Sequence, residues 1–145
     1  MNHRPLSRGA ACLAVAALAL AATACGGRAE RPSAAQIVKV TERDFAIKAP
    51  HVVRAGTVRF VLTNDGPVSH ELIVVRAPKG RLPLRKDGFT VDEAALEAQT
   101  VGALEPDGPD TTRSLDVLLR PGHYILLCNM AGHYMGGMSS RLVVR

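Results

Sequence analysis

Residues 128–138, CNMAGHYMGGM, concentrate the side chains of this chain that could bind a soft metal ion. A thiol, an imidazole and a thioether stand at Cys128, His133 and Met138, with four residues in each interval. Thiolate and thioether are soft ligands and imidazole is intermediate, so this set suits copper best. Zinc binds Cys and His but rarely Met, which makes zinc the weaker candidate.

A mononuclear copper site for electron transfer needs two His and one Cys in a trigonal plane, with a weakly bound axial Met. The loop supplies one His, so the second must come from elsewhere in the chain. His70 is the candidate, because it stands where the turn-rich residues 64–69 enter the apolar run 71–76. In a sandwich of two sheets, this position can lie at the same end as the Cys-to-Met loop.

The other histidines and methionines near these segments have plainer interpretations. His51 and His123 follow turn residues and are expected to be solvated. Met130 and Met135 are expected to pack around the site, since methionine fills irregular gaps well. Met135 nevertheless stays open as an alternative to Met138 for the axial position.

Cys128 and His133 also fit two other kinds of site. A thiol nucleophile activated by a His base would need a third, orienting group, and it would leave Met138 without a role. The chain is therefore not expected to be an enzyme. A binuclear copper centre needs two Cys in the loop, and residues 129–132 offer none, so that centre is excluded.

The elements around the loop are predicted to be strands, because apolar and polar residues alternate with a period of two. Residues 77–112 differ, being rich in Gly, Pro and charge, and a capping-box spacing that starts at Thr90 predicts one short helix there. The pattern predicts an all-β fold, an antiparallel β-sandwich with one short helix. The predicted strands cover roughly residues 38–47, 57–63, 71–76, 114–119, 124–127 and 141–145.

Length and composition limit the possibilities further. The chain has 145 residues, enough for one domain, with 47% hydrophobic and only 3% aromatic residues, so aliphatic side chains must build the core. The formal net charge is +5, and four positive charges lie within residues 79–86. Gly and Pro punctuate that stretch, which is typical of a solvated loop. Without interleaved aromatic residues, nucleic-acid binding is not expected.

The first residues are typical of a targeting segment. Arg4 and Arg8 precede an apolar run over residues 10–22, and a small-residue cleavage site follows at residues 22–24. This arrangement predicts a secretory signal peptide over residues 1–24. The apolar run is short for a transmembrane helix.

Cys25 stands directly after the expected cleavage point, and residues 23–25 resemble a bacterial lipobox. Cys25 is therefore expected to carry a lipid, and residues 25–35 to tether the domain to the membrane. Cleavage without lipidation, giving a soluble periplasmic or secreted protein, stays open. Either way, Cys128 is expected to be the only thiol of the folded domain, because Cys12 is removed with the signal peptide.

Three motifs resemble the cupredoxins, the family of small blue copper proteins: NDGPVSH at residues 64–70, LRPGHYILLC at 119–128, and the C-x4-H-x4-M spacing. The resemblance covers roughly residues 36–145, with 77–112 as a variable insertion. It implies a Greek-key sandwich with one copper ion at one end. By the family pattern, the equatorial ligands are His70, Cys128 and His133, and the axial ligand is Met138.

This chain departs from the family at the residue after the first ligand. Many cupredoxins have Asn there, which ties the two ligand loops together and hydrogen-bonds the Cys sulfur. Glu71 occupies the position here. The sequence leaves open whether a glutamate can link the two ligand loops in the same way.

The resemblance implies a monomeric carrier of single electrons between redox proteins at the extracytoplasmic membrane face. A membrane oxidase or reductase is the expected class of partner. His133 is expected to reach the surface through an apolar docking patch. The alternative function is copper binding or delivery, for an oxidase or for copper tolerance, which the additional Met130 and Met135 would suit. The expected docking patch consists of Pro67, Val68, Ala131, Gly132 and Gly136.

Overall fold

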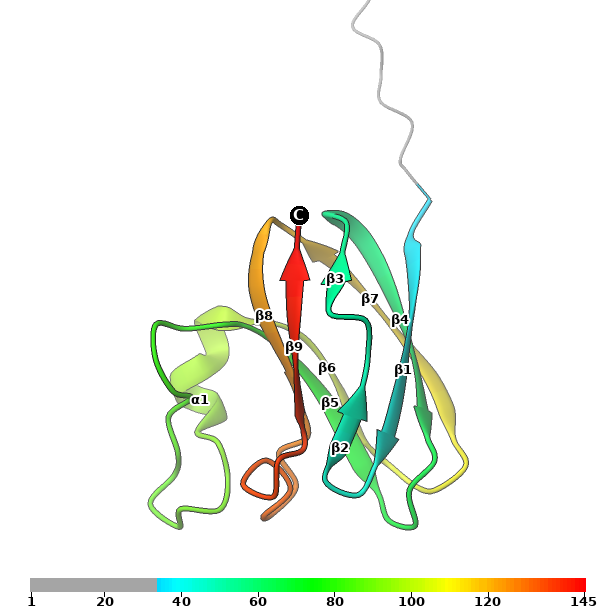
Figure 1. Cartoon of the computed structure of the whole chain (residues 1–145). Coiled ribbons are helices and arrows are strands. Elements are labelled where there is room, and N and C mark those ends of the chain that lie inside the picture. The colour runs from blue at the N-terminus through cyan, green and yellow to red at the C-terminus, as the bar shows by residue number, and fades with distance from the viewer. Residues whose placement is uncertain (1–33) are drawn as a thin grey trace, which may run out of the picture. The chain divides into compact units, whose positions relative to one another are not determined.

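The structure, a computed structural model, describes residues 34–145 of the chain. Two β-sheets pack face to face and enclose a core between them (Figure 1). The expected signal peptide over residues 1–24 and the lipid-attachment site Cys25 lie outside the described residues, as does most of the tether expected over 25–35.

The strands divide into a sheet of four and a sheet of five. The first sheet has the order β2-β1-β4-β7, with β1 (Gln36–Arg43), β2 (Ala46–Lys48), β4 (Gly56–Asn64) and β7 (Thr112–Leu119). The second has the order β3-β9-β8-β5-β6, with β3 (Val52–Val53), β5 (His70–Arg76), β6 (Thr100–Asp107), β8 (Gly122–Leu127) and β9 (Ser139–Val144).

The buried faces of the strands follow the alternation in the sequence. In β4, Val58, Phe60 and Leu62 point into the core, whereas Arg59 is exposed. Successive side chains of a strand face opposite ways, so this register places one apolar set inward. The core between the sheets is largely aliphatic, as the low aromatic content predicts.

Both sheets are mixed rather than wholly antiparallel. β1 runs parallel to β4, with Val38 beside Phe60, and β3 runs parallel to β9, with Val52 beside Val143. The remaining strand pairs are antiparallel. After β1 the chain returns along β2 and then β3 in the other sheet, so β4 sets out in the same direction as β1. The expected all-β sandwich is confirmed, with one parallel pair in each sheet.

Residues 77–112, expected as an insertion, contain a strand that the sequence pattern missed. β6 pairs with β5 at the edge of the second sheet. Gly102 and Pro106 weaken its strand pattern, because both residue types are disfavoured in strands. The tertiary structure requires the glycine: a Cβ on Gly102 would lie 2.7 Å from Val117 Cγ1 of β7. Close packing of β6 on β7 therefore explains why Gly102, a residue type disfavoured in strands, occurs in β6.

The expected short helix is present as α1 (Glu93–Leu96), followed by a 3-10 turn, η1 (Glu97–Gln99). Its N-cap is Asp92 rather than Thr90. The Asp92 carboxylate accepts a hydrogen bond from the Ala95 backbone N–H at 3.3 Å, whereas the Thr90 hydroxyl donates to a carboxylate in the preceding turn. Aspartate is at least as good an N-cap as threonine. The helix therefore begins two residues later than predicted.

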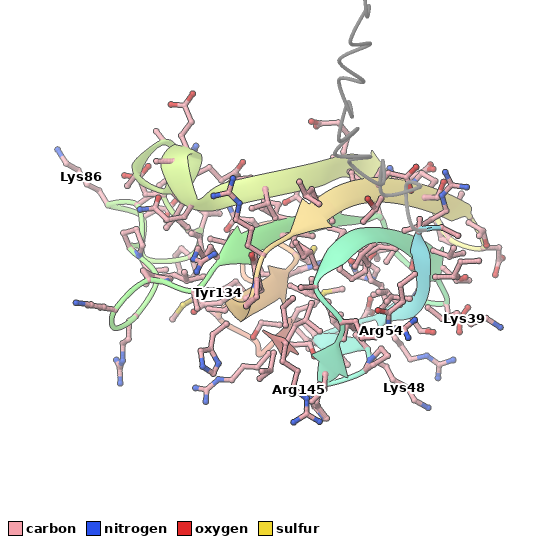
Figure 2. The ribbon with its side chains drawn as sticks, turned by 90° about the horizontal axis from the view of Figure 1, so that it is seen from above. Lys39, Lys48, Arg54, Lys86, Tyr134 and Arg145 are labelled. Atoms are coloured by element: carbon pink, nitrogen blue, oxygen red, sulfur yellow. The ribbon has the colours of Figure 1, made fainter. Side chains whose placement is uncertain are left out.

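The insertion covers the outer face of the second sheet (Figure 1). A second apolar cluster fills this contact, while Lys86 extends into solvent from the insertion (Figure 2). No helix in the described part of the chain has the length and apolarity to cross a membrane. The members of the cluster are Ile73, Val75, Leu82, Val91, Leu96 and Leu127.

One buried carboxyl interrupts the apolar inner face of β1. Glu42 is fully buried, and neither carboxylate oxygen has a hydrogen-bond partner within residues 34–145. Burial is the main cause that raises the pKa of Glu42 from 4.5 to about 8; Arg113 opposes this rise and Glu71 adds to it. The side chain is therefore neutral at moderately acidic pH.

The free energy of unfolding of the metal-free protein is expected to fall as the pH rises from about 4.5 to about 8. Between these values the folded protein holds a proton on Glu42 that the unfolded chain has lost, so each pH unit removes at most about 1.4 kcal/mol. Denaturant unfolding across this range measures the slope. Glu42→Gln should flatten it, whereas Glu97→Gln, at an exposed carboxylate, should not; equal slopes in all three proteins would contradict the assignment.

Candidate metal centre

Three of the predicted ligands come together at one end of the sandwich. The ligand atoms of His70, Cys128 and His133 all lie within 4.8 Å of one another. Cys128 Sγ is 4.0 Å from His70 Nδ1 and 3.4 Å from His133 Nδ1. The imidazole rings of the two histidines meet edge to face, with centroids 5.1 Å apart. A compact N2S donor set of this kind is the equatorial set that a type 1 copper ion requires.

Strand pairing explains why these ligands meet. His70 opens β5 and Cys128 directly follows β8, and the two strands are antiparallel neighbours with Ile73 beside Leu127. The start of one strand therefore lies next to the end of the other. The chain then turns through the ligand loop, residues 128–138, and returns as β9 (Figure 1).

Backbone hydrogen bonds fix the shape of the ligand loop. The Cys128 N–H donates to the Met138 carbonyl at 3.2 Å, which joins the two ends of the loop. Inside it, the His133 N–H donates to the Met130 carbonyl at 2.8 Å, and the Met138 N–H donates to the His133 carbonyl at 2.9 Å. Gly137 has a φ of 104°, a conformation that favours glycine. The loop thus holds His133 by its own backbone.

The three loop methionines occupy different environments. Met138 is fully buried in the same core cluster as Cys128, and Met130 packs partly buried against that cluster. Met135 is 53% exposed. Burial beside the cysteine favours Met138 over Met135 as the axial ligand, and Met130 packs as expected.

The cysteine is a buried thiol rather than an activated one. Burial is the main cause that raises the pKa of Cys128 to about 11 in the metal-free protein, although backbone N–H groups of Glu71 and Met130 hydrogen-bond the sulfur and oppose the rise. A nucleophilic cysteine needs a lowered pKa, so this environment gives no support to a thiol enzyme. A metal would have to displace the thiol proton on binding.

The first histidine is held in its metal-binding form. His70 is completely buried, and its burial, followed by the neighbouring His133, lowers the pKa of the imidazole despite Asp44 nearby. The ring is therefore neutral at physiological pH, as a metal ligand must be. His133 is only partly buried and gives the site a route to the surface.

Glu71 links the two ligand segments by a hydrogen bond, a point that the sequence left open. One carboxylate oxygen of Glu71 accepts a hydrogen bond from the Asn129 backbone N–H at 3.0 Å, which links the segments after His70 and after Cys128. The backbone N–H of Glu71 also acts on the sulfur, because it opposes the rise in the pKa of Cys128. A glutamate thus replaces the family's asparagine in this tie.

Sequence reasoning missed the role of Asn129. Its buried side-chain amide accepts from the Val91 N–H at 2.6 Å and donates to the Val91 carbonyl at 3.0 Å and to Glu93 Oε1 at 2.7 Å. The residue next to the ligand cysteine is thereby bonded to the insertion. Only its place beside Cys128 could have drawn attention to it in the sequence.

The turn between β1 and β2 is a second element that sequence reasoning did not connect with the site. Phe45 packs its ring edgewise on the His133 imidazole, with centroids 5.7 Å apart. Its neighbour Asp44 lies against the first histidine, with Oδ1 3.2 Å from His70 Nε2. A turn 83 residues before the start of the ligand loop thus contacts both histidines.

The residues of the expected docking patch lie in the loops around these ligands. Pro67, Val68, Ala131 and Gly136 are exposed and Gly132 is partly buried. Three further apolar residues near the ligand loop are exposed and were not expected in this patch: Phe45, Phe89 and Met135. His51 and His123 are exposed, as expected, and take no part in the site.

No protein family model matches the chain, and no curated protein matches it in sequence. The fold is similar to that of dithionite-reduced auracyanin from the photosynthetic bacterium Roseiflexus castenholzii, at 18% identity and a TM-score of 0.57, over 77% of this chain and 98% of that chain. It is also similar to auracyanin A of Chloroflexus aurantiacus, a "blue" copper protein, at 19% identity and a TM-score of 0.55, over 75% of this chain and 98% of that chain.

A third similar structure is an azurin from the methylotroph Methylomonas sp. strain J, at 14% identity and a TM-score of 0.55, over 77% of this chain and 99% of that chain. The chain therefore has the cupredoxin fold, and the arrangement of His70, Cys128, His133 and Met138 fits a type 1 site and supports one copper ion as the cofactor.

Proposed function

We propose that this protein is a mononuclear type 1 copper protein that carries single electrons between redox partners. The observation that carries the proposal is that the ligand atoms of His70, Cys128 and His133 lie within 4.8 Å of one another. His70, Cys128 and Met138 are buried, whereas His133 is partly exposed. The three equatorial donors and the axial thioether would hold the metal, which when bound supplies a one-electron change between Cu(I) and Cu(II).

The chain's contribution is to keep the donors in place during that change. His70 and Cys128 are buried on adjacent strands, and the hydrogen bonds across the ligand loop restrain His133. Donors that cannot move much keep the geometry of both charge states similar. A small reorganisation supports rapid electron transfer.

Exposed apolar side chains around His133 support a docking surface for a redox partner. Phe45 is 54% and Phe89 63% exposed, and both lie next to the ligand loop: Phe45 on His133, and Phe89 through its carbonyl, which accepts from the Gly132 N–H. A small apolar contact of this kind suits transient redox encounters. Pro67 and Val68 of the expected patch are also exposed and would extend this surface.

We place the protein outside the cytoplasm, attached to the membrane through a lipid on Cys25 and working as a monomer. The support is the signal-peptide pattern of residues 1–24 and the lipobox-like residues 23–25. Such an anchor would concentrate the carrier near a membrane oxidase or reductase, the partner class we propose. Copper delivery is the second candidate function, favoured by the exposed thioether of Met135 beside the site.

Replacement of the cysteine tests the ligand set directly. Cys128→Ser is expected to abolish the intense visible band that the purified protein develops on Cu(II) titration, since that band requires a sulfur-to-copper bond. Met135→Leu, in the same loop, should keep the band. A band retained in Cys128→Ser would refute the ligand assignment, and tight Cu(I) binding with no band in the unaltered protein would favour copper delivery.

Replacement of the two candidate thioethers tests the axial position. Met138→Gln is expected to keep the band and lower the reduction potential, because a harder ligand favours Cu(II); a tenfold change in relative affinity corresponds to about 59 mV. Voltammetry measures the shift. Met135→Gln should leave the potential unchanged, and the reverse result would assign the axial role to Met135.

The docking surface can be tested by electron self-exchange, in which two copies of the protein meet. Val68→Lys is expected to slow self-exchange about tenfold at low salt and to leave the potential unchanged, because it sets like charges opposite each other. NMR line broadening in mixed Cu(I) and Cu(II) samples measures the rate. Leu118→Lys is the matched control, because Leu118 is also exposed and lies at the opposite end of the sandwich. Equal rates in both variants would place docking elsewhere.

A further inference from the structure

We propose that Asp44 is a positioning residue of the copper centre: its carboxylate accepts the Nε2 proton of His70 and stabilises the more positive state of the metal. The proposal rests on the proposed function, because it requires that His70 binds the metal through Nδ1. It assigns a task to the β1–β2 turn, which contributes no ligand.

His70 Nε2 and Asp44 Oδ1 face each other and have no other polar partner among the described residues. His70 Nε2 and Asp44 Oδ1 lie 3.2 Å apart, and both atoms are buried. Their alignment falls short of a hydrogen bond in this structure, and neither atom has another partner within residues 34–145. The Asp44 side chain is 36% exposed. The proposal requires it to turn so that Oδ1 aligns with the Nε2 proton.

The chemistry of a histidine ligand requires such an acceptor. Nδ1 is the ring nitrogen of His70 that faces the Cys128 sulfur, so metal binding there leaves the proton on Nε2. A buried N–H without an acceptor costs free energy. Carboxylates that accept from a ligand histidine also fix its ring orientation and raise its basicity.

The absence of a side chain at Gly66 allows His70 and Asp44 to approach each other. A Cβ at Gly66 would lie 2.6 Å from His70 Nε2 and 3.2 Å from Asp44 Oδ1, so no other residue fits without displacing the pair. The Gly66 N–H donates to Asn64 Oδ1 at 2.9 Å, which holds the loop in place. The glycine thus leaves the space in which the carboxylate and the imidazole approach.

The turn that carries Asp44 has an unusual backbone. Phe45 has a φ of 59°, in the left-handed region that bulky residues rarely adopt. Such conformations persist only where surrounding contacts hold them. Here the Phe45 ring packs on His133 and occupies the space over Gly136, where a Cβ would lie 2.2 Å from the ring. The anchored Phe45 therefore fixes Asp44 against His70.

Asp44→Asn tests the proposal, because it removes the negative charge and keeps the shape of the side chain. Asp65→Asn is the matched control, since it removes the same charge from the exposed neighbouring loop without facing His70. Asp44→Asn is expected to weaken Cu(II) binding 10–100-fold, in the range found for partners of ligand histidines. It should weaken Cu(I) binding less, so that a tenfold difference raises the potential by about 59 mV. Asp65→Asn should change neither.

A measurement on the unaltered sequence keeps the test independent of variant folding. In the Zn(II)-loaded protein, the His70 Nε2 proton should be visible by NMR and protected from solvent exchange, and Asp44→Asn should shift it. If the unaltered protein forms no blue band, the proposed function fails. If the band forms but Asp44→Asn matches Asp65→Asn in potential and affinity, or the proton exchanges freely, the role of Asp44 is refuted.

Discussion

The antiparallel pairing of β5 with β8 is the interaction on which the site depends, because it brings the start of one strand beside the end of the other. His70 and Cys128 are 58 positions apart in the chain, yet their ligand atoms lie 4.0 Å apart, because His70 opens β5 and Cys128 directly follows the last residue of β8. The ligand loop then has only to bring His133 back to this fixed pair. A site built on paired strands is more rigid than one built on loops.

The polar groups of the core gather around this end of the molecule. Within residues 34–145, the buried polar and charged residues are Glu42, Asn64, His70 and Asn129, and each lies at a strand end near the ligands. Everywhere else the core is apolar. Buried polar groups lower stability unless they are hydrogen-bonded. Their concentration at one end of an otherwise apolar core is therefore expected where that end is a functional site.

Residue types and short spacings were enough to predict the donor set and much of the fold. The C-x4-H-x4-M spacing indicates a soft metal because it places a thiol, an imidazole and a thioether in one short loop, and the two-residue periodicity places residues such as Val58 and Phe60 on one inward face. These signals are local, so they can be read without knowing which other segments of the chain pack against them. The same local signals failed for β6, because its Gly102 is set by the approach of β7.

The contacts that support the ligands could not be predicted from the sequence, because they form between distant segments of the folded chain. The tertiary structure distinguished the buried Met138 from the exposed Met135, paired Glu71 with the backbone of Asn129, and placed Asp44 and Phe45 on the two histidines. No periodicity or motif encodes these contacts, since each joins segments far apart in the chain and depends on which strands become neighbours. Ligand chemistry is a property of residue types and short spacings, whereas the burial and charge around a ligand are properties of the assembled sheets.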